Sequence, residues 1–285
     1  MLLQPYTLNE LHFAYCYRVY FRWRTHYAKP IAPLASLNTA ILGELLDEYG
    51  IHVLECMGDA TDVLTHVSLK PTESISSCAS KIKGRVSKWL REELRLQQPT
   101  KLLSVGYFAC TVGRSTREAV EVYLASQGEH HGYNRRVLPP VYLATYDLVG
   151  DDNRILPRHA FVISRFHVVL ATARRQGILG TSQGQRISDA WRGMEAKLGF
   201  SLLKISVVPD HVHSALRLHP AVSPAELVVA LMNAAQEAMQ PELVAAGLNR
   251  LWCASAYIGS YGELASPQIR KYLENWRARG EAVAS

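Results

Sequence analysis

Hydrophobic and polar side chains alternate along residues 17–24. In a β-strand, successive side chains point to opposite faces, so the two kinds of residue are separated onto different faces. One face is predicted to carry Tyr17, Val19, Phe21 and Trp23, and the other Arg18, Tyr20, Arg22 and Arg24. The segment is therefore predicted to be a strand with one apolar and one mainly basic face.

The same order of elements is predicted twice. After the opening strand of each half, the pattern gives a helix, two strands, a second helix, a fourth strand that ends in glycine, and a last helix. The middle elements are predicted at 34–49, 51–57, 63–69 and 74–94 in the first half, and at 186–198, 200–208, 211–218 and 223–239 in the second. The order βαββαβα predicts an α+β fold in each half, with a mainly antiparallel sheet and helices packed on it, ferredoxin-like in character.

A shift of 149 residues superimposes the two halves of the sequence. Identical residues then coincide without a gap: Gly50 with Gly199, Gly113 with Gly262, and Tyr123 with Tyr272. The opening strands HFAYCYRVYF (12–21) and HAFVISRFHVVL (159–170) are also similar at nearly this shift. We predict duplicated domains at 1–128 and 157–285 and a linker at 129–156, in which residues 141–148 alternate and could add a strand.

Composition and charge are those of a globular protein with a small excess of positive charge. The 285 residues are 48% hydrophobic, which suits a soluble globular protein, and the net charge of +6 permits a polyanionic partner without requiring one. The five cysteines are scattered without a CxxC pair and are expected to be reduced thiols. We recognise no signal peptide and no apolar run long enough to span a membrane, so a cytoplasmic protein without membrane contact is expected.

Two short patterns could carry chemistry. His211 and His213 are two positions apart on a predicted strand, so both side chains can converge on one metal ion, although a polar strand face gives the same pattern by chance. Tyr123 and Gln127 are four apart on a predicted helix and share a face. The alternative interpretation of this second pair is an ordinary amphipathic stripe.

The sequence PDHVH (209–213), followed by a helix, a strand ending in glycine and a helix with a tyrosine, resembles the single-tyrosine HUH transposases. That family includes insertion-sequence and REP-associated tyrosine transposases. The segment YFACTVGRSTREAVEVYLASQ (107–127) is similar to its tyrosine helix and preceding strand, and the resemblance covers both halves. It implies a metal-dependent endonuclease and strand transferase for single-stranded DNA. In such enzymes two histidines and a glutamine bind a divalent ion, and the tyrosine becomes linked to a 5′ phosphate. A cation that binds a phosphate oxygen is expected to be Mg²⁺ or Mn²⁺.

Each half lacks what the other half retains of the family's pattern. The second half keeps both histidines and Tyr272, but Trp276 occupies the glutamine position. The first half keeps the tyrosine and the glutamine, but Asp62 and Leu64 occupy the histidine positions. A register slip could bring in the nearby His66, which would still lack a partner histidine. The first half has lost the histidines and the second half the glutamine. Such complementary losses are expected for a fused dimer in which one active site survives.

The resemblance also implies how the halves would cooperate, because insertion-sequence relatives are dimers whose sites combine histidines of one subunit with the tyrosine helix of the other. We therefore expect an internal pseudo-dimer, acting as a monomer, in which Tyr123 is the nucleophile and His211, His213 and Gln127 hold the metal. One alternative is catalysis within the second half by Tyr272. Another is a catalytically inactive, regulatory protein that binds a DNA hairpin.

Basic residues are the candidates for DNA binding. Arg18, Arg22 and Arg24 alternate with Tyr20 along one strand face, a mixture that suits single-stranded DNA. A second set, at i, i+4 and i+7 of the predicted helix 74–94, comprises Lys81, Arg85 and Lys88. For both sets the alternative is a solvated protein surface. The second half's equivalent helix has no Lys or Arg, so unequal DNA contacts by the two halves are expected.

Overall fold

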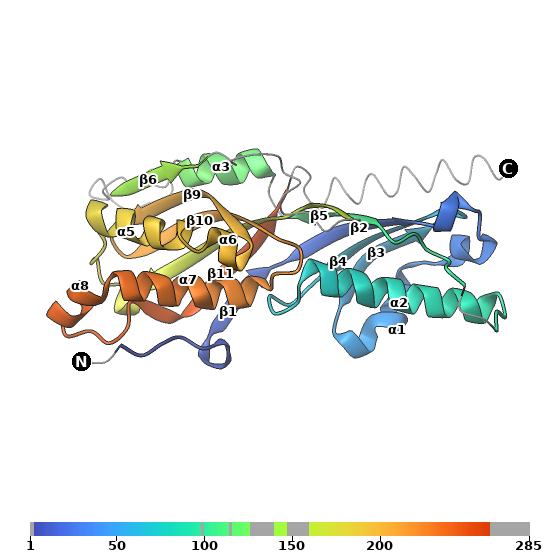
Figure 1. Cartoon of the computed structure of the whole chain (residues 1–285), viewed down its shortest axis with the longest axis horizontal. Helices are drawn as coiled ribbons and strands as arrows, with labels where there is room; N and C mark the ends of the chain where they lie inside the picture. The colour runs from blue at the N-terminus through green and yellow to red at the C-terminus, as the bar shows by residue number, and fades with distance from the viewer. Residues whose placement is uncertain (1–2, 98–99, 114–115, 126–139, 147–159, 263–285) are drawn as a thin grey trace.

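The computed structural model describes residues 3–97, 100–113, 116–125, 140–146 and 160–262 (Figure 1). Its strands are β1 (His12–Cys16), β2 (Arg18–Arg24), β3 (His52–Gly58), β4 (Asp62–Ser68), β5 (Tyr107–Val112), β6 (Tyr142–Thr145), β7 (Ala160–Ile163), β8 (Arg165–Thr172), β9 (Phe200–Val208), β10 (His211–Leu218) and β11 (Trp252–Tyr261). Its α-helices are α1 (Thr39–Leu46), α2 (Ile75–Glu93), α3 (Arg117–Ala125), α5 (Thr181–Arg192), α6 (Glu195–Leu198), α7 (Pro224–Ala238) and α8 (Gln240–Ala245). Short 3-10 helices are η1 (Leu8–Glu10), η2 (His26–Ala28), η3 (Ala32–Ser36), η4 (Asp47–Tyr49) and η6 (Ala173–Arg175).

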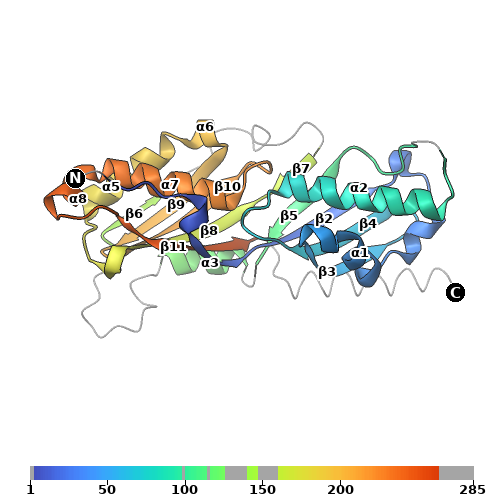
Figure 2. The ribbon, with the colours of Figure 1, turned by 90° about the horizontal axis from the view of Figure 1, so that it is seen from below.

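Two β-sheets lie next to each other along the long axis of the molecule (Figures 1 and 2). Sheet A has the strand order β1-β11-β8-β10-β9-β6, and sheet B has the order β3-β4-β2-β5-β7. Helices α5 and α7 cover one face of sheet A, while α3 lies on its opposite face (Figure 2). Helices α1 and α2 cover sheet B on the same side as α7. The predicted α+β class is confirmed.

The two sheets contain the same arrangement of four strands. The order is β11-β8-β10-β9 in sheet A and β5-β2-β4-β3 in sheet B, and all neighbours in both sets are antiparallel. The 149-residue repeat of the sequence is therefore also a repeat of the strand topology. Within the alternating stretch predicted at 141–148, of which 147 and 148 lie outside the described residues, Tyr142–Thr145 form β6, which pairs with β9 at the edge of sheet A.

The opening strand of each half is divided between the two sheets. The sequence predicted a continuous strand across residues 12–21, but the strand breaks at Tyr17, and β1 pairs in parallel with β11 in sheet A while β2 lies in sheet B. The second half breaks at Ser164 in the same way, so that β7 pairs in parallel with β5 in sheet B. Each half therefore contributes an edge strand to the sheet of the other.

A buried hydroxyl group stands at each of the two breaks. Arg18 N donates to Ser260 Oγ, and Arg165 N donates to Thr111 Oγ1, both at 2.8 Å. Ser260 Oγ also donates to Val112 O, and Thr111 Oγ1 to Tyr261 O, both at 2.7 Å. Since Ser260 is the 149-residue counterpart of Thr111, these bonds form a symmetric pair that holds the two halves together.

Replacing Thr111 by Val is expected to lower the free energy of unfolding by about 1–3 kcal/mol. The substitution keeps the shape of this buried side chain but leaves Arg165 N without its acceptor and Tyr261 O without its donor. Urea denaturation followed by circular dichroism measures the change. Thr181→Val, which removes one hydroxyl on the surface of α5, is the matched control, and an equal effect of both variants would contradict the expectation.

The hydrophobic core lies between the sheets and the covering helices. Tyr17, Val19, Phe21 and Trp23 are each at most 1% exposed, so the predicted apolar face of this strand is confirmed. In the second half Trp191 of α5 is fully buried and donates its indole N–H to Leu231 O at 2.9 Å. Burying each such large apolar side chain stabilises the fold by roughly 1.5–3 kcal/mol.

The helix predicted at 34–49 is shorter than expected. Asn38 Oδ1 accepts hydrogen bonds from Ala40 N and Ile41 N, so the α-helix begins at Thr39, and residues 32–36 form a separate 3-10 turn that contains Pro33. The helix predicted at 186–198 instead begins at Thr181 and is divided into α5 and α6. Within the described part of the chain, no helix combines the length and the apolar character needed to cross a lipid bilayer.

Candidate functional site

The two predicted metal-binding histidines lie side by side on β10. His211 and His213 alternate with Val212 and have their ring centroids 4.8 Å apart, and their residues are 7% and 3% exposed. His211 Nδ1 lies 2.6 Å from Asp210 Oδ1. A carboxylate only accepts, so Nδ1 carries a proton, and Nε2 is the ring nitrogen left as a possible metal ligand.

A third histidine, which the sequence analysis did not select, completes the cluster. His167 on β8 has its Nε2 at 3.0 Å from Nδ1 of His213, and the two rings are nearly parallel. Burial lowers the pKa of His167 to about 4, so this imidazole is neutral at pH 7. A single histidine in an alternating strand has no motif of its own, and only the pairing of β8 with β10 places it here.

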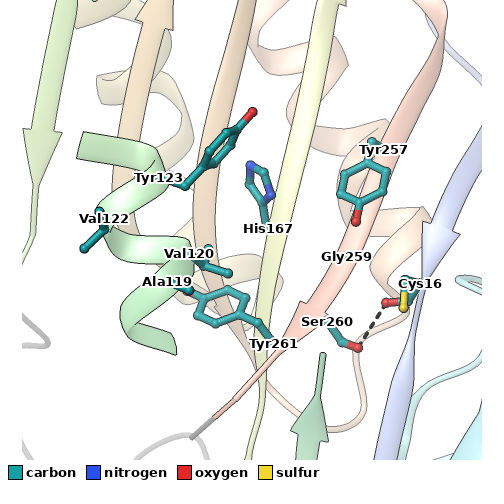
Figure 3. A pocket seen from close by; sticks show the side chains of 10 residues that line it. All are labelled: Cys16, Ala119, Val120, Val122, Tyr123, His167, Tyr257, Gly259, Ser260 and Tyr261. Carbon is teal, nitrogen blue, oxygen red and sulfur yellow. Dashed lines mark hydrogen bonds between the residues drawn. The ribbon is translucent and has the colours of Figure 1, made fainter. Parts of the chain in front are cut away.

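Tyr123 on α3 lies beside His167 of this histidine cluster (Figure 3). Its ring centroid lies 5.7 Å from that of His213 and 6.0 Å from that of His167, in edge-to-face geometry. Leu124, the next residue, is fully buried against Ala215 and Tyr261 and so anchors the helix on sheet A. The structure therefore brings a tyrosine of the first half to the histidines of the second.

A cavity of about 490 Å³ adjoins Tyr123 and His167 (Figure 3). Its described lining comes from α3, from β8 and β11 of the second half, and from the exchanged strand β1. The lining residues are Cys16, Ala119, Val120, Val122, Tyr123, His167, Tyr257, Gly259, Ser260 and Tyr261. The cavity is large enough for a small ligand, since such pockets measure roughly 300–1,000 Å³.

The corresponding position in the first half carries different side chains. The strand registers match between the halves, so Asp62 is the structural counterpart of His211 and Leu64 that of His213. His66 is the counterpart of Ala215, and no slip brings it to a ligand position. Leu64 is buried in an apolar cluster with Tyr20, and the carboxylate of Asp62 is held by arginines.

Two of the three strand arginines predicted to bind DNA lie at this first-half position, opposite Leu64 and Asp62. Arg22 Nε is 2.8 Å and Arg24 Nε 3.6 Å from Asp62 Oδ1. The backbone N–H of Arg18 takes part in the junction between the halves. Tyr20, expected between them on a basic face, is only 6% exposed, because its ring packs in the apolar cluster with Met57, Leu64 and Val112.

The second predicted basic set lies on α2, away from the histidine cluster (Figure 1). Each of its side chains pairs with a carboxylate: Lys81 with Glu73 at 2.6 Å, Arg85 with Glu48, and Lys88 with Glu92 at 3.9 Å. The structure thus does not bring Lys81, Arg85 and Lys88 to the site. Gln127, Tyr272 and Trp276 lie outside the described residues.

Among the described residues, no cluster of three or more His, Cys, Asp or Glu side chains is arranged to hold a metal ion. His211 and His213 would therefore need a ligand of another kind or one from elsewhere in the chain. The sequence-based prediction supplies one in Gln127, two residues beyond the end of α3.

The sequence profile of the family described as "Transposase IS200 like" matches residues 15–127 and again residues 162–276. The chain belongs to the IS200-like transposase family. The family repeats divide the site, because Tyr123 lies in the first match whereas His167, His211 and His213 lie in the second. The predicted resemblance to this group of transposases is thus confirmed.

Individual relatives of this IS200-like transposase match about two fifths of it. The ISDra2 transposase TnpA of Deinococcus radiodurans is 30% identical over 118 residues, which are 39% of this chain and 81% of that protein. A crystal structure of a transposase from Deinococcus radiodurans R1 is 27% identical, covers 40% of this chain and 92% of its own, and has a TM-score of 0.33. A REP-associated tyrosine transposase bound to a REP hairpin is 18% identical, covers 38% and 61%, and has a TM-score of 0.27.

Proposed function

We propose that the protein cuts and rejoins single-stranded DNA at one composite site, with Tyr123 as the nucleophile. The observation that carries this proposal is the position of Tyr123, from the first family repeat, with its ring 5.7 Å from that of His213 in the second repeat. The first repeat lacks the histidine pair and the second lacks the glutamine, so only the combined site has the tyrosine, the glutamine and both histidines.

The two repeats form an internal pseudo-dimer of ferredoxin-like units in this proposal. The shared strand order and the exchanged edge strands support it. So does a reciprocal pair of backbone hydrogen bonds, from Ser76 N to Pro220 O at 2.8 Å and from Ala225 N to Pro71 O at 2.9 Å, which are related by the 149-residue shift. One chain would then contain everything that a dimer of single-repeat relatives contains, and it would act as a monomer.

The imidazoles present fit a divalent cation. His211 donates its Nδ1–H to the carboxylate of Asp210. This hydrogen bond orients histidine ligands in metal sites and leaves Nε2 to bind the metal. His213 likewise keeps Nε2 for the metal when its Nδ1–H donates to Nε2 of the neutral His167. With Gln127 as a third ligand, bound Mg²⁺ or Mn²⁺ would supply charge neutralisation at a non-bridging phosphate oxygen.

Replacing Asp210 by Asn is expected to weaken Mn²⁺ binding by about 10–100-fold, because the carboxylate no longer fixes the tautomer and orientation of His211. Isothermal titration calorimetry measures the affinity. Asp189→Asn, which removes an exposed carboxylate on α5, is the control and should bind Mn²⁺ like the unmodified protein. Equal affinities of both variants would argue against His211 as a ligand oriented in this way.

The chemistry proposed for Tyr123 is an in-line displacement at phosphorus. The phenol loses its proton, its oxygen forms a bond to phosphorus, the bond to the 3′ oxygen breaks, and that oxygen takes up a proton. The 5′-phosphotyrosine linkage retains the energy of the broken phosphodiester. Attack by another 3′ hydroxyl can therefore reverse the step and join new DNA ends without a further energy source.

The DNA partner is proposed to be single-stranded with a hairpin, in line with the REP hairpin bound to the REP-associated transposase. Arg18, Arg22 and Arg24 remain candidates for phosphate contacts, and the last two line a second cavity together with Phe108. Lys81, Arg85 and Lys88 could contribute a weaker, salt-dependent attraction, because each already has a carboxylate partner.

Covalent capture on a denaturing gel tests the proposal. The protein is mixed with single-stranded oligonucleotides from the DNA flanking its gene, with Mg²⁺, Mn²⁺ or EDTA. We expect a protein–DNA adduct that forms only with the metal. Binding in EDTA without any adduct in metal would favour the inactive hairpin-binding regulator, since a protein that only binds needs no cation.

A further inference from the structure

The cavity beside Tyr123 has a flat aromatic ring on the side away from α3. His167 stands between the rings of Tyr123 and Tyr257 in Figure 3, and its centroid is 5.9 Å from that of Tyr257. Tyr257 is 38% exposed, although its strand β11 lies inside sheet A and not at an edge. An accessible aromatic ring in a cavity next to the nucleophile is a potential stacking surface.

Sheet B contains an internal counterpart of this ring. The 149-residue shift places Phe108 of β5 at the position of Tyr257, and β7 pairs with β5 in parallel as β1 pairs with β11. Opposite Phe108 lies Phe161, and the two rings are stacked with centroids 5.8 Å apart and planes within 12°. Opposite Tyr257 lies Ala14, which has no ring that could stack as Phe161 does.

A glycine makes room for the Tyr257 ring in the cavity lining. Gly259 lies two residues beyond Tyr257, and a Cβ atom built there would come within 2.6 Å of Tyr257 Oη. Its counterpart in sheet B is Cys110, whose side chain packs against the apolar cluster around Tyr20. Sheet B therefore has Phe161 and Cys110 around its ring, whereas sheet A has the smaller Ala14 and Gly259.

We propose that the cavity binds one unstacked nucleobase of the DNA, stacked on Tyr257 as Phe161 is stacked on Phe108. This inference rests on the proposed function, because it places the base beside the phosphodiester that Tyr123 attacks. Every base has a π-face, so such a site selects unpaired DNA with only a modest sequence preference. A base within a duplex would first have to leave its stack.

Photo-crosslinking tests the site without requiring cleavage. Single-stranded oligonucleotides of random sequence, with 5-iodouracil in place of thymine, are irradiated with the full-length protein in EDTA, and crosslinked residues are mapped by mass spectrometry. We expect a crosslink at Tyr257. In Ala14→Phe, whose new ring takes the place that Phe161 has in sheet B, this crosslink should fall at least tenfold. Phe161→Ala, the matched control, should leave it unchanged.

A second variant keeps the base site testable if Ala14→Phe does not fold. Gly259→Ala forces the Tyr257 ring to move and should reduce the same crosslink, while a thermal melt verifies that each variant folds. No crosslink at Tyr257, or one that both variants leave intact, would overturn the base site. Metal-dependent adducts in that case would leave the proposed cleavage standing, whereas a sensitive crosslink without any adduct would support the base site in a protein that only binds DNA.

Discussion

Replacing Tyr123 by Phe is expected to abolish the covalent DNA adduct, lowering its rate of formation by about 10³-fold or more. The variant lacks only the hydroxyl oxygen that would attack phosphorus, and loss of a nucleophile removes the covalent route altogether. The ring that packs near His213 and His167 is retained, so folding and DNA binding should change little. Denaturing gels quantify the adduct, and fluorescence anisotropy in EDTA measures binding.

Tyr272→Phe is the matched control for this experiment, because Tyr272 is the counterpart of Tyr123 under the 149-residue shift. We expect it to form the adduct at the normal rate. An adduct lost only in Tyr272→Phe would instead place catalysis within the second repeat and leave the first as a scaffold. The position of Tyr123 against the second repeat's histidines favours the first outcome.

Replacing His213 by Ala is expected to lower metal-dependent cleavage by at least about 10²-fold. Loss of a residue that only orients a ligand costs about 10–100-fold, and loss of the ligand itself should cost no less. The affinity for Mn²⁺ should fall in parallel, as measured by calorimetry. DNA binding in EDTA should be retained, because the proposed DNA contacts do not include His213.

His52→Ala is the control, since His52 is exposed on β3 in sheet B and should affect neither quantity. A His213→Ala protein that still folds, as judged by its melting temperature, and binds Mn²⁺ normally would contradict the metal role of the histidine pair. Cleavage lost with metal binding intact would assign His213 to positioning Tyr123 instead.

A single composite site has a consequence for how DNA ends would be handled. The first repeat offers Asp62 and Leu64 where the second offers imidazoles, and Arg22 and Arg24 already neutralise the Asp62 carboxylate. The pseudo-symmetric position therefore holds DNA at most through charge and stacking. One chain would cleave one strand at a time and treat two ends unequally.

Much of the fold could be predicted from the sequence. Alternation identified the buried face of β2, and β9 and β10 have the bounds that their hydrophobic pattern predicted. These features are local, because a two-residue or 3.6-residue period depends only on neighbours along the chain. The exchange of β1 and β7 between the sheets was not predicted, because an alternating strand carries no information about which sheet its backbone will join.

The candidate site, like the fold, was predictable from the sequence only in part. The sequence by itself determined that the chain is duplicated, that the histidine pair survives only in the second copy, and that a tyrosine followed by the glutamine survives only in the first. Only the tertiary structure decided that α3 reaches sheet A, that His167 contacts His213, and that Tyr257 is 38% exposed beside Ala14. These contacts join strands and helices that are far apart in sequence. They depend on strand pairing and on the two strand breaks, where the hydroxyls of Ser260 and Thr111 hold one half against the other.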